Sequence, residues 1–385
     1  MNIISIFLVV SIFIFLDVCS TCPQLTYVIR DQKFRVASDV TTTRENLDII
    51  ISHLSSNHQP PQAHIVWYLP QNHQNIYSSK PKTMPFSVGG SFLTNEEKRA
   101  LEETAAALST RGKGITACDE SAGTIGKRFE EVGIENTEEN RRQYRQMLFE
   151  APGCENYLCA AILDPETLYQ KSDGGKLFPE LLSEKGIVPG VKPHLKVYTL
   201  PGTNGDTVMQ GLDSLAVRCK EYRNAGARFA KWRSPLVIDM EKGCPTDLAI
   251  KANMHDLARY ALICQSEGIM PIVEPDVSLK GTHTLEQAVD VNIRVQSELF
   301  KSMIDHGVYM PGTTLKPNIV NPGKDCRTSY TVEEIAEANV FVLEQSFPVA
   351  MKGANFLSGG QDLLTAAARL NAMNKANKKG PWNLR

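Results

Sequence analysis

Short apolar runs alternate with amphipathic helical stretches along most of this 385-residue chain, and this alternation restricts the fold more than any other feature. The runs are rich in Val, Ile, Leu and Ala and occupy residues 114–119, 157–164, 186–192, 227–233, 269–275, 312–317 and 354–360. Because they are continuously apolar, they are typical of strands buried on both faces. Helical periodicity fills the intervals, at residues 137–150, 209–226, 247–268, 284–307 and 331–346. Strand and helix in strict turn predict parallel β-α units.

The expected helices carry start and stop signals. Thr94 followed by Glu97 is a capping box, which predicts a helix through about residue 109. The same signal recurs later, at Thr284 with Gln287 and at Thr331 with Glu334. Several helical stretches end in glycine, the residue preferred just after a helix C-terminus.

The number of β-α units favours a barrel. Seven units at spacings of roughly 30 to 45 residues fit a TIM (β/α)8 barrel, whose usual length is about 250 residues. A doubly wound open sheet is the alternative, disfavoured because no Gly-x-Gly-x-x-Gly pattern follows the first strand. Only seven strands are counted, so we expect a barrel truncated within strand 8, with unpaired edges on strands 1 and 7.

Composition excludes several classes of partner. A net charge of −2 gives no electrostatic reason to expect a nucleic acid or an anionic membrane as partner of the mature body. Seven of the nine cysteines lie beyond residue 84, mostly in apolar context, and are interpreted as reduced thiols. A metal centre is not expected, because the body histidines lack ligand-like spacing; they are His194, His255, His283 and His306.

The N-terminal region differs from the rest. Residues 3–16 form an apolar run of signal-peptide length, so residues 1–20 are interpreted as a signal-like segment. Residues 21–90 are rich in Asn, Gln, His, Ser and Pro and are interpreted as a poorly ordered extension, followed by a barrel domain at 91–385. We expect a cytoplasmic protein if translation starts near Met84, and a plastid or secretory route if the apolar segment is genuine.

Charged and polar residues follow every predicted strand. In a β/α barrel the carboxyl ends of the strands share one rim, where catalytic groups collect. The residues at these ends are Asp119, Glu120, Ser121, Asp164, Glu166, Lys192, Lys231, Arg233, Glu274, Asp276, Lys316, Ser358, Gly359 and Gly360. Several cations together with carboxylates suit a polyanionic substrate and acid/base chemistry.

Lys316 stands at a strand end directly before Pro317, which ends regular strand pairing. An amine is nucleophilic only when neutral, and a free lysine with a pKa near 10.4 is about 0.04% neutral at pH 7. Desolvation and neighbouring cations such as Lys231 and Arg233 favour the neutral form. A lysine so placed can condense with a ketone to a Schiff base, whose iminium accepts electrons during C–C cleavage.

The strand-end motifs resemble those of class I fructose-bisphosphate aldolase, the metal-independent Schiff-base type. The resemblance covers about residues 92 to 384 and rests on "GKGITACDES", "ETLYQKSDGGKLFPE", "GTNGDTVMQGLD", "GARFAKWR", "PIVEP", "LKPNIV", "FLSGGQ" and "LNAMNK". It implies cleavage of fructose 1,6-bisphosphate into dihydroxyacetone phosphate and glyceraldehyde 3-phosphate, and the reverse condensation. It further implies no cofactor and a homotetramer.

The resemblance also implies roles for individual residues. Lys316 would form the Schiff base, Glu274 would act as general acid/base, and Asp119 would assist proton removal at the C4 hydroxyl. Lys231 would lie beside the iminium. Asp276 stands where the family has a second glutamate, and as a shorter carboxylate it is expected to lie farther from Lys316. Contacts to hydroxyls and phosphates would come from Arg233, Ser121, Thr124 and Lys192 at one end and from Ser358 and Gly359 at the other.

Two other functions stay open at this stage. An incomplete barrel could be a catalytically weak or inactive homologue that binds a sugar phosphate or a protein. A different Schiff-base barrel enzyme, such as a transaldolase, is the other alternative, but it would not combine "FLSGGQ" with "ARFAKWR".

Overall fold

The computed structural model describes residues 26–29, 32–35 and 89–385. The chain divides into two units, Met1–Thr83 and Met84–Arg385. In the first unit, β1 (Thr26–Ile29) pairs antiparallel with β2 (Gln32–Arg35). The predicted signal-like segment, and the predicted extension apart from these strands and residues 89–90, lie outside the described residues. Among the described helices, none combines the length and apolarity that a bilayer crossing requires.

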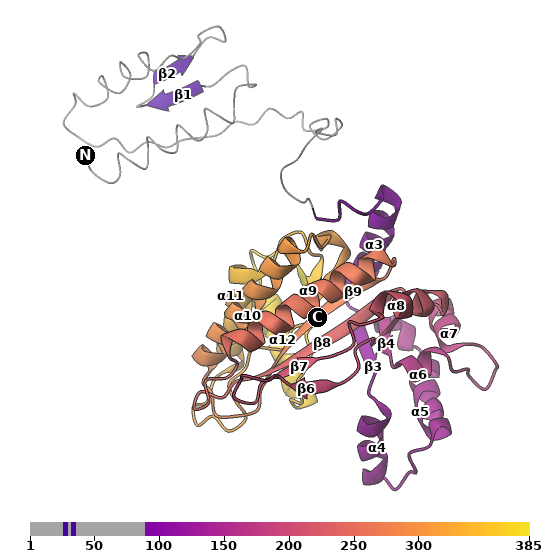
Figure 1. The fold of residues 1–385 in the computed structure, drawn as a ribbon. Helices are drawn as coiled ribbons and strands as arrows, with labels where there is room; N and C mark the ends of the chain where they lie inside the picture. The colour runs from indigo at the N-terminus through magenta and orange to yellow at the C-terminus, as the bar shows by residue number, and fades with distance from the viewer. Residues whose placement is uncertain (1–25, 30–31, 36–88) are drawn as a thin grey trace. The chain divides into compact units, whose positions relative to one another are not determined.

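Eight parallel strands form one curled sheet in the second unit, in the order β12-β11-β10-β9-β8-β5-β4-β3 (Figure 1). Their bounds are β3 Gly114–Cys118, β4 Leu158–Leu163, β5 Val188–Val191, β8 Phe229–Val237, β9 Met270–Ser278, β10 Thr314–Leu315, β11 Gly353–Ala354 and β12 Asn383–Leu384. Each predicted apolar run contains or overlaps one of the first seven strands, which confirms the parallel β-α organisation of a TIM-barrel fold.

The eighth strand, β12, pairs in parallel with β11. The predicted unpaired edge on strand 7 is therefore wrong, while β12 and β3 stand at the two ends of the sheet order. Two side chains from β12 and the residue after it contact the connection that leads into β3, the other end of the sheet order. Asn383 Nδ2 donates to Ser109 O at 3.2 Å, and an Arg385 guanidinium nitrogen donates to Leu108 O at 2.8 Å.

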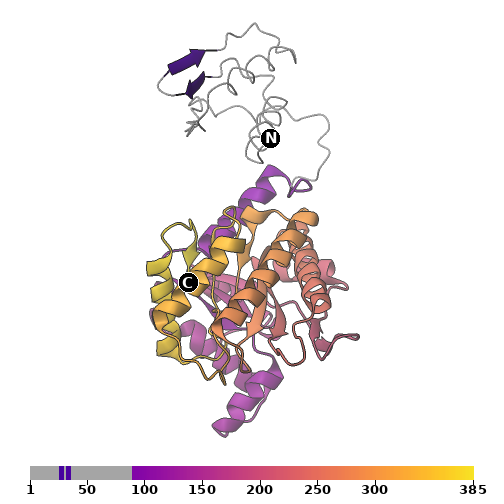
Figure 2. The same ribbon diagram turned by 90° about the vertical axis from the view of Figure 1, so that its left-hand side faces the viewer.

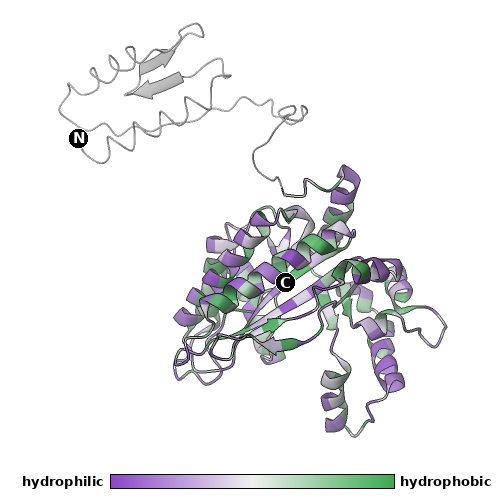
Figure 3. Ribbon diagram, viewed as in Figure 1, coloured by the Kyte–Doolittle hydropathy of each residue, from purple (hydrophilic) through white to green (hydrophobic). Residues whose placement is uncertain are grey.

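Helices follow most strands, and Figure 2 shows them on the outside of the sheet. They are α3 Asn95–Ala107, α4 Ala122–Glu131, α5 Glu138–Glu150, α6 Pro165–Leu168, α7 Phe178–Glu184, α8 Leu215–Asn224, α9 Asp247–Ser266, α10 Leu285–Asp305, α11 Val332–Ser346 and α12 Leu363–Ala376. The capping boxes predicted for α3, α10 and α11 are confirmed. The amphipathic pattern of the helices appears in Figure 3 as alternating hydrophilic and hydrophobic ribbon segments.

The predicted helix at residues 209–226 is too long at its start, because α8 begins at Leu215. Met209 instead ends β7 (Thr207–Met209), which forms an antiparallel hairpin with β6 (Val197–Thr199). Gly211, with φ of 126°, and Ser214, with φ of 56°, turn the chain out of this hairpin before the helix starts. The apolar spacing of the stretch is compatible with a helix, but its backbone is held by the hairpin partner.

The inner face of the sheet is apolar toward the amino ends of its strands. Phe229, Met270 and Ile272 from β8 and β9 pack with Ile162 of β4 and with the helix that covers this end, α3. Leu101 of α3 is 2% exposed and belongs to the same cluster. This apolar plug excludes water from the strand segments directly below the charged residues of the rim.

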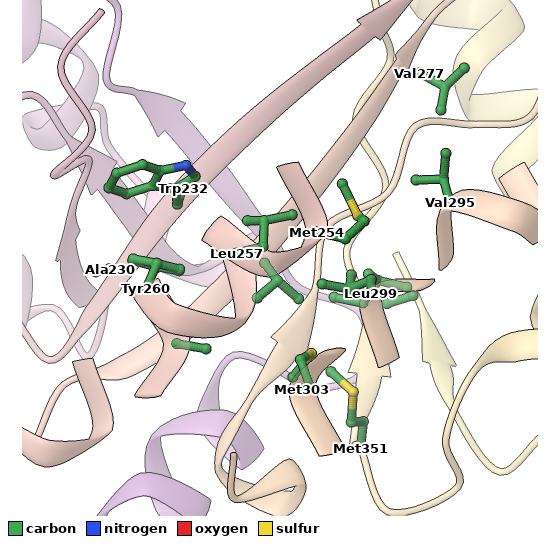
Figure 4. Close-up of a cluster of buried hydrophobic side chains, with 14 of the residues drawn as sticks. Ala230, Trp232, Met254, Leu257, Tyr260, Val277, Val295, Leu299, Met303 and Met351 are labelled. Atoms are coloured by element: carbon green, nitrogen blue, oxygen red, sulfur yellow. The ribbon is translucent and has the colours of Figure 1, made fainter. Parts of the chain in front are cut away.

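A second, larger core lies between the strands and the outer helices. Trp232 of β8 points outward, opposite to its neighbour Lys231, and packs on Tyr260 of α9 with ring centroids 5.3 Å apart. Figure 4 shows this cluster continuing through Leu257 and Met254 to Leu299 of α10. Because side chains alternate along a strand, the outer core fixes which residues of β8 face inward.

Gly190 of β5 lies against the Phe229 ring, and a Cβ at Gly190 would overlap three of its ring carbons. We expect Gly190→Ala to lower the free energy of unfolding by about 1–3 kcal/mol, because the added methyl overpacks the plug. Gly123→Ala is the control: no atom lies within 4 Å of its added Cβ, and alanine favours the surrounding helix. Urea denaturation measures both, and equal midpoints for the two variants would contradict the packing of Phe229 on β5.

Candidate active site

Two neighbouring strands carry charged side chains above the apolar plug. On β8, Lys231 and Arg233 follow Phe229 at intervals of two, so all three face inward. The parallel register of β8 and β9 pairs Arg233 with Glu274. Since β9 also continues with alternating side chains, Asp276 lies on the same face, one step nearer the rim.

The end of β10 places Lys316 beside these residues. The backbone N–H of Lys316 donates to Val273 O of β9 at 2.8 Å, which continues the ladder past the last residue of β10. Pro317 donates no hydrogen bond, but its carbonyl accepts from Leu357 N on the other side at 2.9 Å. The backbone around the lysine is thus fixed from both neighbouring strands, although proline ends the regular pairing.

Three buried groups, Asp119, Lys231 and Glu274, and the partly buried Lys316 form one chain of ion pairs at the ends of β3, β8, β9 and β10. Lys231 Nζ lies 2.7 Å from Asp119 Oδ2 and 3.2 Å from Glu274 Oε2. Lys316 Nζ donates to the same Glu274 oxygen at 3.1 Å. One carboxylate oxygen therefore receives two ammonium groups, and Lys231 bridges two carboxylates.

The ion pairs outweigh the cost of burial. Burial alone would raise the pKa of Glu274, but the ammonium groups of Lys231 and Lys316 bring it below its ordinary value. Burial likewise works against ionised Asp119, whose pKa is nevertheless lowered, chiefly by Lys231. For Lys231, burial favours the neutral amine, yet the two carboxylates hold its pKa above the ordinary value. Lys231 is the cation that both carboxylates stabilise.

The other predicted residues near this network lie in more local pairs. Arg233 donates to Asp276 Oδ2 at 2.7 Å, and its side chain is 44% exposed, so the guanidinium also faces solvent. Lys192 Nζ donates to Asp119 O at 2.6 Å and pairs with Asp164 Oδ2 at 2.8 Å. Lys192 thereby ties together the carboxyl ends of β3, β4 and β5.

Ser121 and Thr124 lie at the start of α4, where the Ser121 hydroxyl caps the helix by accepting from Thr124 N at 3.4 Å. Both side chains are exposed. Ser358 and Gly359 lie just after β11 in an exposed turn, with Gly359 and Gly360 at φ of 63° and 85°. The predicted contacts of these four residues with substrate stay predictions.

Two carboxylates from the strand ends lie in structural ion pairs instead. Glu120 pairs with Arg128 and with Arg145, and Glu166 forms a two-pronged pair with Arg141 at 2.8 and 2.7 Å. Arg145 is 1% exposed and also donates to Cys118 O at 2.8 Å, so it supports the end of β3. Arg141 and Arg145 lie on α5, whose sequence gave no sign of a buried charge, and Arg128 lies on α4.

His194 was not assigned to the site from sequence. Its ring lies edge-on to Trp232, with centroids 5.9 Å apart. Burial, with Lys231 and Lys192 nearby, lowers the pKa of His194 to about 3, so the imidazole is neutral at pH 7. Its position two residues after Lys192, just past the end of β5, is the sequence signal that could have identified it.

The chain is similar to known proteins over about three quarters of its length. A family model described as fructose-bisphosphate aldolase class-I matches residues 100–385. Fructose-bisphosphate aldolase of Echinococcus multilocularis is 49% identical over 294 residues, covering 76% of this chain and 80% of that protein. The enzyme of Dictyostelium discoideum is 48% identical, covering 74% and 80%. The crystal structure of Plasmodium falciparum fructose-bisphosphate aldolase, in complex with TRAP and an inhibitor, superposes with a TM-score of 0.74 at 44% identity, covering 75% of this chain and 83% of that one.

The bridging position of Lys231 makes its removal costly. We expect Lys231→Met to lower the free energy of unfolding at pH 7 by about 3–5 kcal/mol, because buried Asp119 loses its ion-pair partner. Adding Asp119→Asn should restore part of the loss. The deficit should persist from pH 7 down to the ordinary carboxylate values of 3.8 and 4.5 and shrink below them. The reason is that carboxylates with lowered folded pKa stabilise the wild type above those values and lose this contribution as pH falls through the folded pKa.

Urea denaturation between pH 3 and 7 measures these effects. Lys242→Met is the matched control, since Lys242 pairs with Asp239 in solvent and its side chain is 64% exposed. We expect no measurable shift for this control. A Lys231→Met midpoint equal to that of the control would show that the ammonium is not buried between the two carboxylates.

Proposed function

Because the chain belongs to the class I fructose-bisphosphate aldolase family, we propose how its own residues divide the steps of the family's reaction. The chain is a lyase that cleaves fructose 1,6-bisphosphate to dihydroxyacetone phosphate and glyceraldehyde 3-phosphate through a lysine Schiff base, and catalyses the reverse condensation. The homologues that match about three quarters of this chain are aldolases, so the alternative of a non-catalytic binding subunit is not favoured.

Lys316 is the nucleophile in this proposal. The observation that carries it is the 3.1 Å hydrogen bond from Lys316 Nζ to Glu274 Oε2, inside the strand ends and above the apolar plug. The ammonium must lose a proton before it attacks, and the ionised Glu274 carboxylate is the acceptor within reach. The neutral amine then adds to the C2 ketone and gives a carbinolamine.

Glu274 next returns a proton in its acid form. Protonation of the carbinolamine hydroxyl lets it leave as water, and the iminium forms. Lys231 Nζ, 3.2 Å from the same Glu274 oxygen, stabilises the carboxylate whenever it is ionised. The two lysines thus take different parts: Lys316 forms the covalent bond, and Lys231 maintains the charge of the base.

Asp119 is the base for C–C cleavage. Its pKa lies below the ordinary value, so it is ionised at neutral pH and able to accept the proton of the C4 hydroxyl. As that proton leaves, the C3–C4 bond breaks, glyceraldehyde 3-phosphate departs, and the bonding electrons pass into the iminium to form an enamine. Protonation and hydrolysis of the enamine release dihydroxyacetone phosphate and free Lys316.

The phosphate ends of the substrate fall to opposite sides of this network. We assign one end to Arg233, whose exposed guanidinium edge lies beside Asp276, with help from Ser121 and Thr124. Ser358 and Gly359 take the other end, in a turn where glycine lets an oxyanion approach the backbone closely. We keep Lys192 near the sugar, as predicted. Its amine is already bonded to Asp164 and to Asp119 O, so its role is to hold Asp119 and the ends of β3 and β4 in place.

Assembly and location are proposed on the family alone. A homotetramer is proposed from the family resemblance. A cytoplasmic location, for translation that begins near Met84, accords with relatives such as the 48% identical cytosolic fructose-bisphosphate aldolase 4 of Arabidopsis thaliana. Analytical ultracentrifugation of the purified chain would measure the assembly.

The identity of the Schiff-base lysine is tested by borohydride trapping. Dihydroxyacetone phosphate and borohydride should leave a reduced three-carbon adduct on Lys316, found by peptide mass spectrometry. Lys316→Ala should abolish both the adduct and cleavage activity while its thermal melt stays cooperative. Lys251→Ala, an exposed lysine on α9, is the control and should keep both. An adduct on Lys231 would overturn the division of roles.

The class I assignment also predicts independence from metal ions. An iminium on Lys316 provides the electron sink that a metal supplies in other aldolases, so dialysis against EDTA should leave the rate of fructose 1,6-bisphosphate cleavage unchanged. The rate is followed by the appearance of triose phosphate. Activity that falls with EDTA and returns with added zinc would contradict the proposed mechanism.

A further inference from the structure

A cavity of about 340 Å³ lies outside the acid/base network, between the connection that follows β10 and the start of α12. Its walls include Asn321 and Lys324 on the first side and Gln361, Asp362 and Arg369 on the second. The proposed catalytic residues are not part of these walls. The volume lies within the range of pockets that bind small molecules.

Two cations of the cavity lack acidic partners. Within residues 89–385, neither Lys324 nor Arg369 forms an ion pair. One Arg369 guanidinium nitrogen donates to Gln361 Oε1, while its Nε is buried without a hydrogen-bond partner among the described residues. Burial lowers the pKa of Arg369, which reflects a guanidinium removed from water without a carboxylate beside it. Such an uncompensated donor is costly unless an anion meets it.

The one acid of the walls is already occupied. Asp362 caps α12, where its Oδ2 accepts from Thr365 N at 2.9 Å and from Thr365 Oγ1 at 3.1 Å. The start of this 14-residue helix adds a partial positive charge to the same wall. The lining side chains therefore carry a net charge of +1, from Lys324 and Arg369 against Asp362.

Asn321 adds an acceptor without a partner. Its side chain is 5% exposed, and its Nδ2 donates to Ile319 O at 2.8 Å, which fixes the orientation of the amide. Its Oδ1 accepts no hydrogen bond from the described residues. A ligand that carries a hydroxyl next to its anionic group would complement both features of the wall.

We propose that this cavity binds the phosphate group of inorganic phosphate or of a small phosphate ester, as a second anion site separate from the Lys316 network. A phosphate dianion offers several acceptor oxygens, which a guanidinium and an ammonium bind with charge-assisted hydrogen bonds. Gly360 forms part of the wall, and a Cβ placed there would lie 3.7 Å from Lys324 Nζ, so the backbone of the turn after Ser358 borders the bound anion.

The site is tested by equilibrium dialysis of the full chain with radiolabelled inorganic phosphate at low ionic strength. We expect the double variant Lys324→Ala, Arg369→Ala to bind one phosphate fewer per chain than the wild type. Lys324 is exposed, so the single Lys324→Ala variant keeps the fold in any case and should weaken the same site at least about tenfold, the value of one charge-assisted hydrogen bond.

Matched controls separate this site from general charge and from the substrate's phosphate contacts. Lys378→Ala with Arg111→Ala removes one exposed lysine and one exposed arginine elsewhere and should leave the stoichiometry unchanged. Ser358→Ala should also leave this phosphate bound. The proposal is overturned if the Lys324 and Arg369 variants bind as much phosphate as the wild type, or if the control pair loses as much.

Competition distinguishes the two sources of phosphate. Glycerol 3-phosphate carries hydroxyl groups that can donate to Asn321 Oδ1. If the site binds a phosphate ester, glycerol 3-phosphate should displace the labelled phosphate more strongly than unlabelled inorganic phosphate does. Equal or weaker displacement identifies inorganic phosphate as the ligand. Either result supports the phosphate site, provided that the displaced fraction disappears in the Lys324→Ala, Arg369→Ala variant.

Discussion

The charged centre of the barrel depends on one buried carboxylate, Glu274, whose Oε2 accepts from Lys231 and from Lys316. A buried carboxylate without partners would become protonated or would unfold its surroundings. Because the two ammonium groups come from β8 and β10, on either side of β9, the ion pairs form only if three strands keep their register. The same contacts that make the site chemically competent therefore also specify how the strands align.

The alternation of side chains along β8 divides the interior into two layers. Phe229 belongs to the apolar plug beneath, and Lys231, two residues on, belongs to the charged layer above. The plug excludes water below the ion pairs, which strengthens the electrostatic interactions between them. A proton can then pass between Lys316 and Glu274 over 3.1 Å without competition from bulk water on that side.

The sequence predicted where the strands lie because continuous apolar runs bounded by helices have few other interpretations. It also placed the charged residues at the correct ends of those strands. It could not assign their partners, since pairing is decided across strands: Asp119 faces inward to Lys231, whereas the next residue, Glu120, faces Arg145 of α5. The hairpin of β6 and β7 was missed for a similar reason, because three-residue strands carry too little periodicity to be distinguished from a helix start.

The same principle of charge compensation separates the two cationic regions of the barrel. The amines of Lys231, Lys316 and Lys192 each have a carboxylate within 3.2 Å, so the charge of each amine is compensated in place. Lys324, in the connection after β10, and Arg369, on α12, line one cavity, but the described residues form no ion pair with either. The buried charges around Glu274 are all compensated by protein groups. The half-buried guanidinium of Arg369 is not, and an anion from solution would supply the missing negative charge.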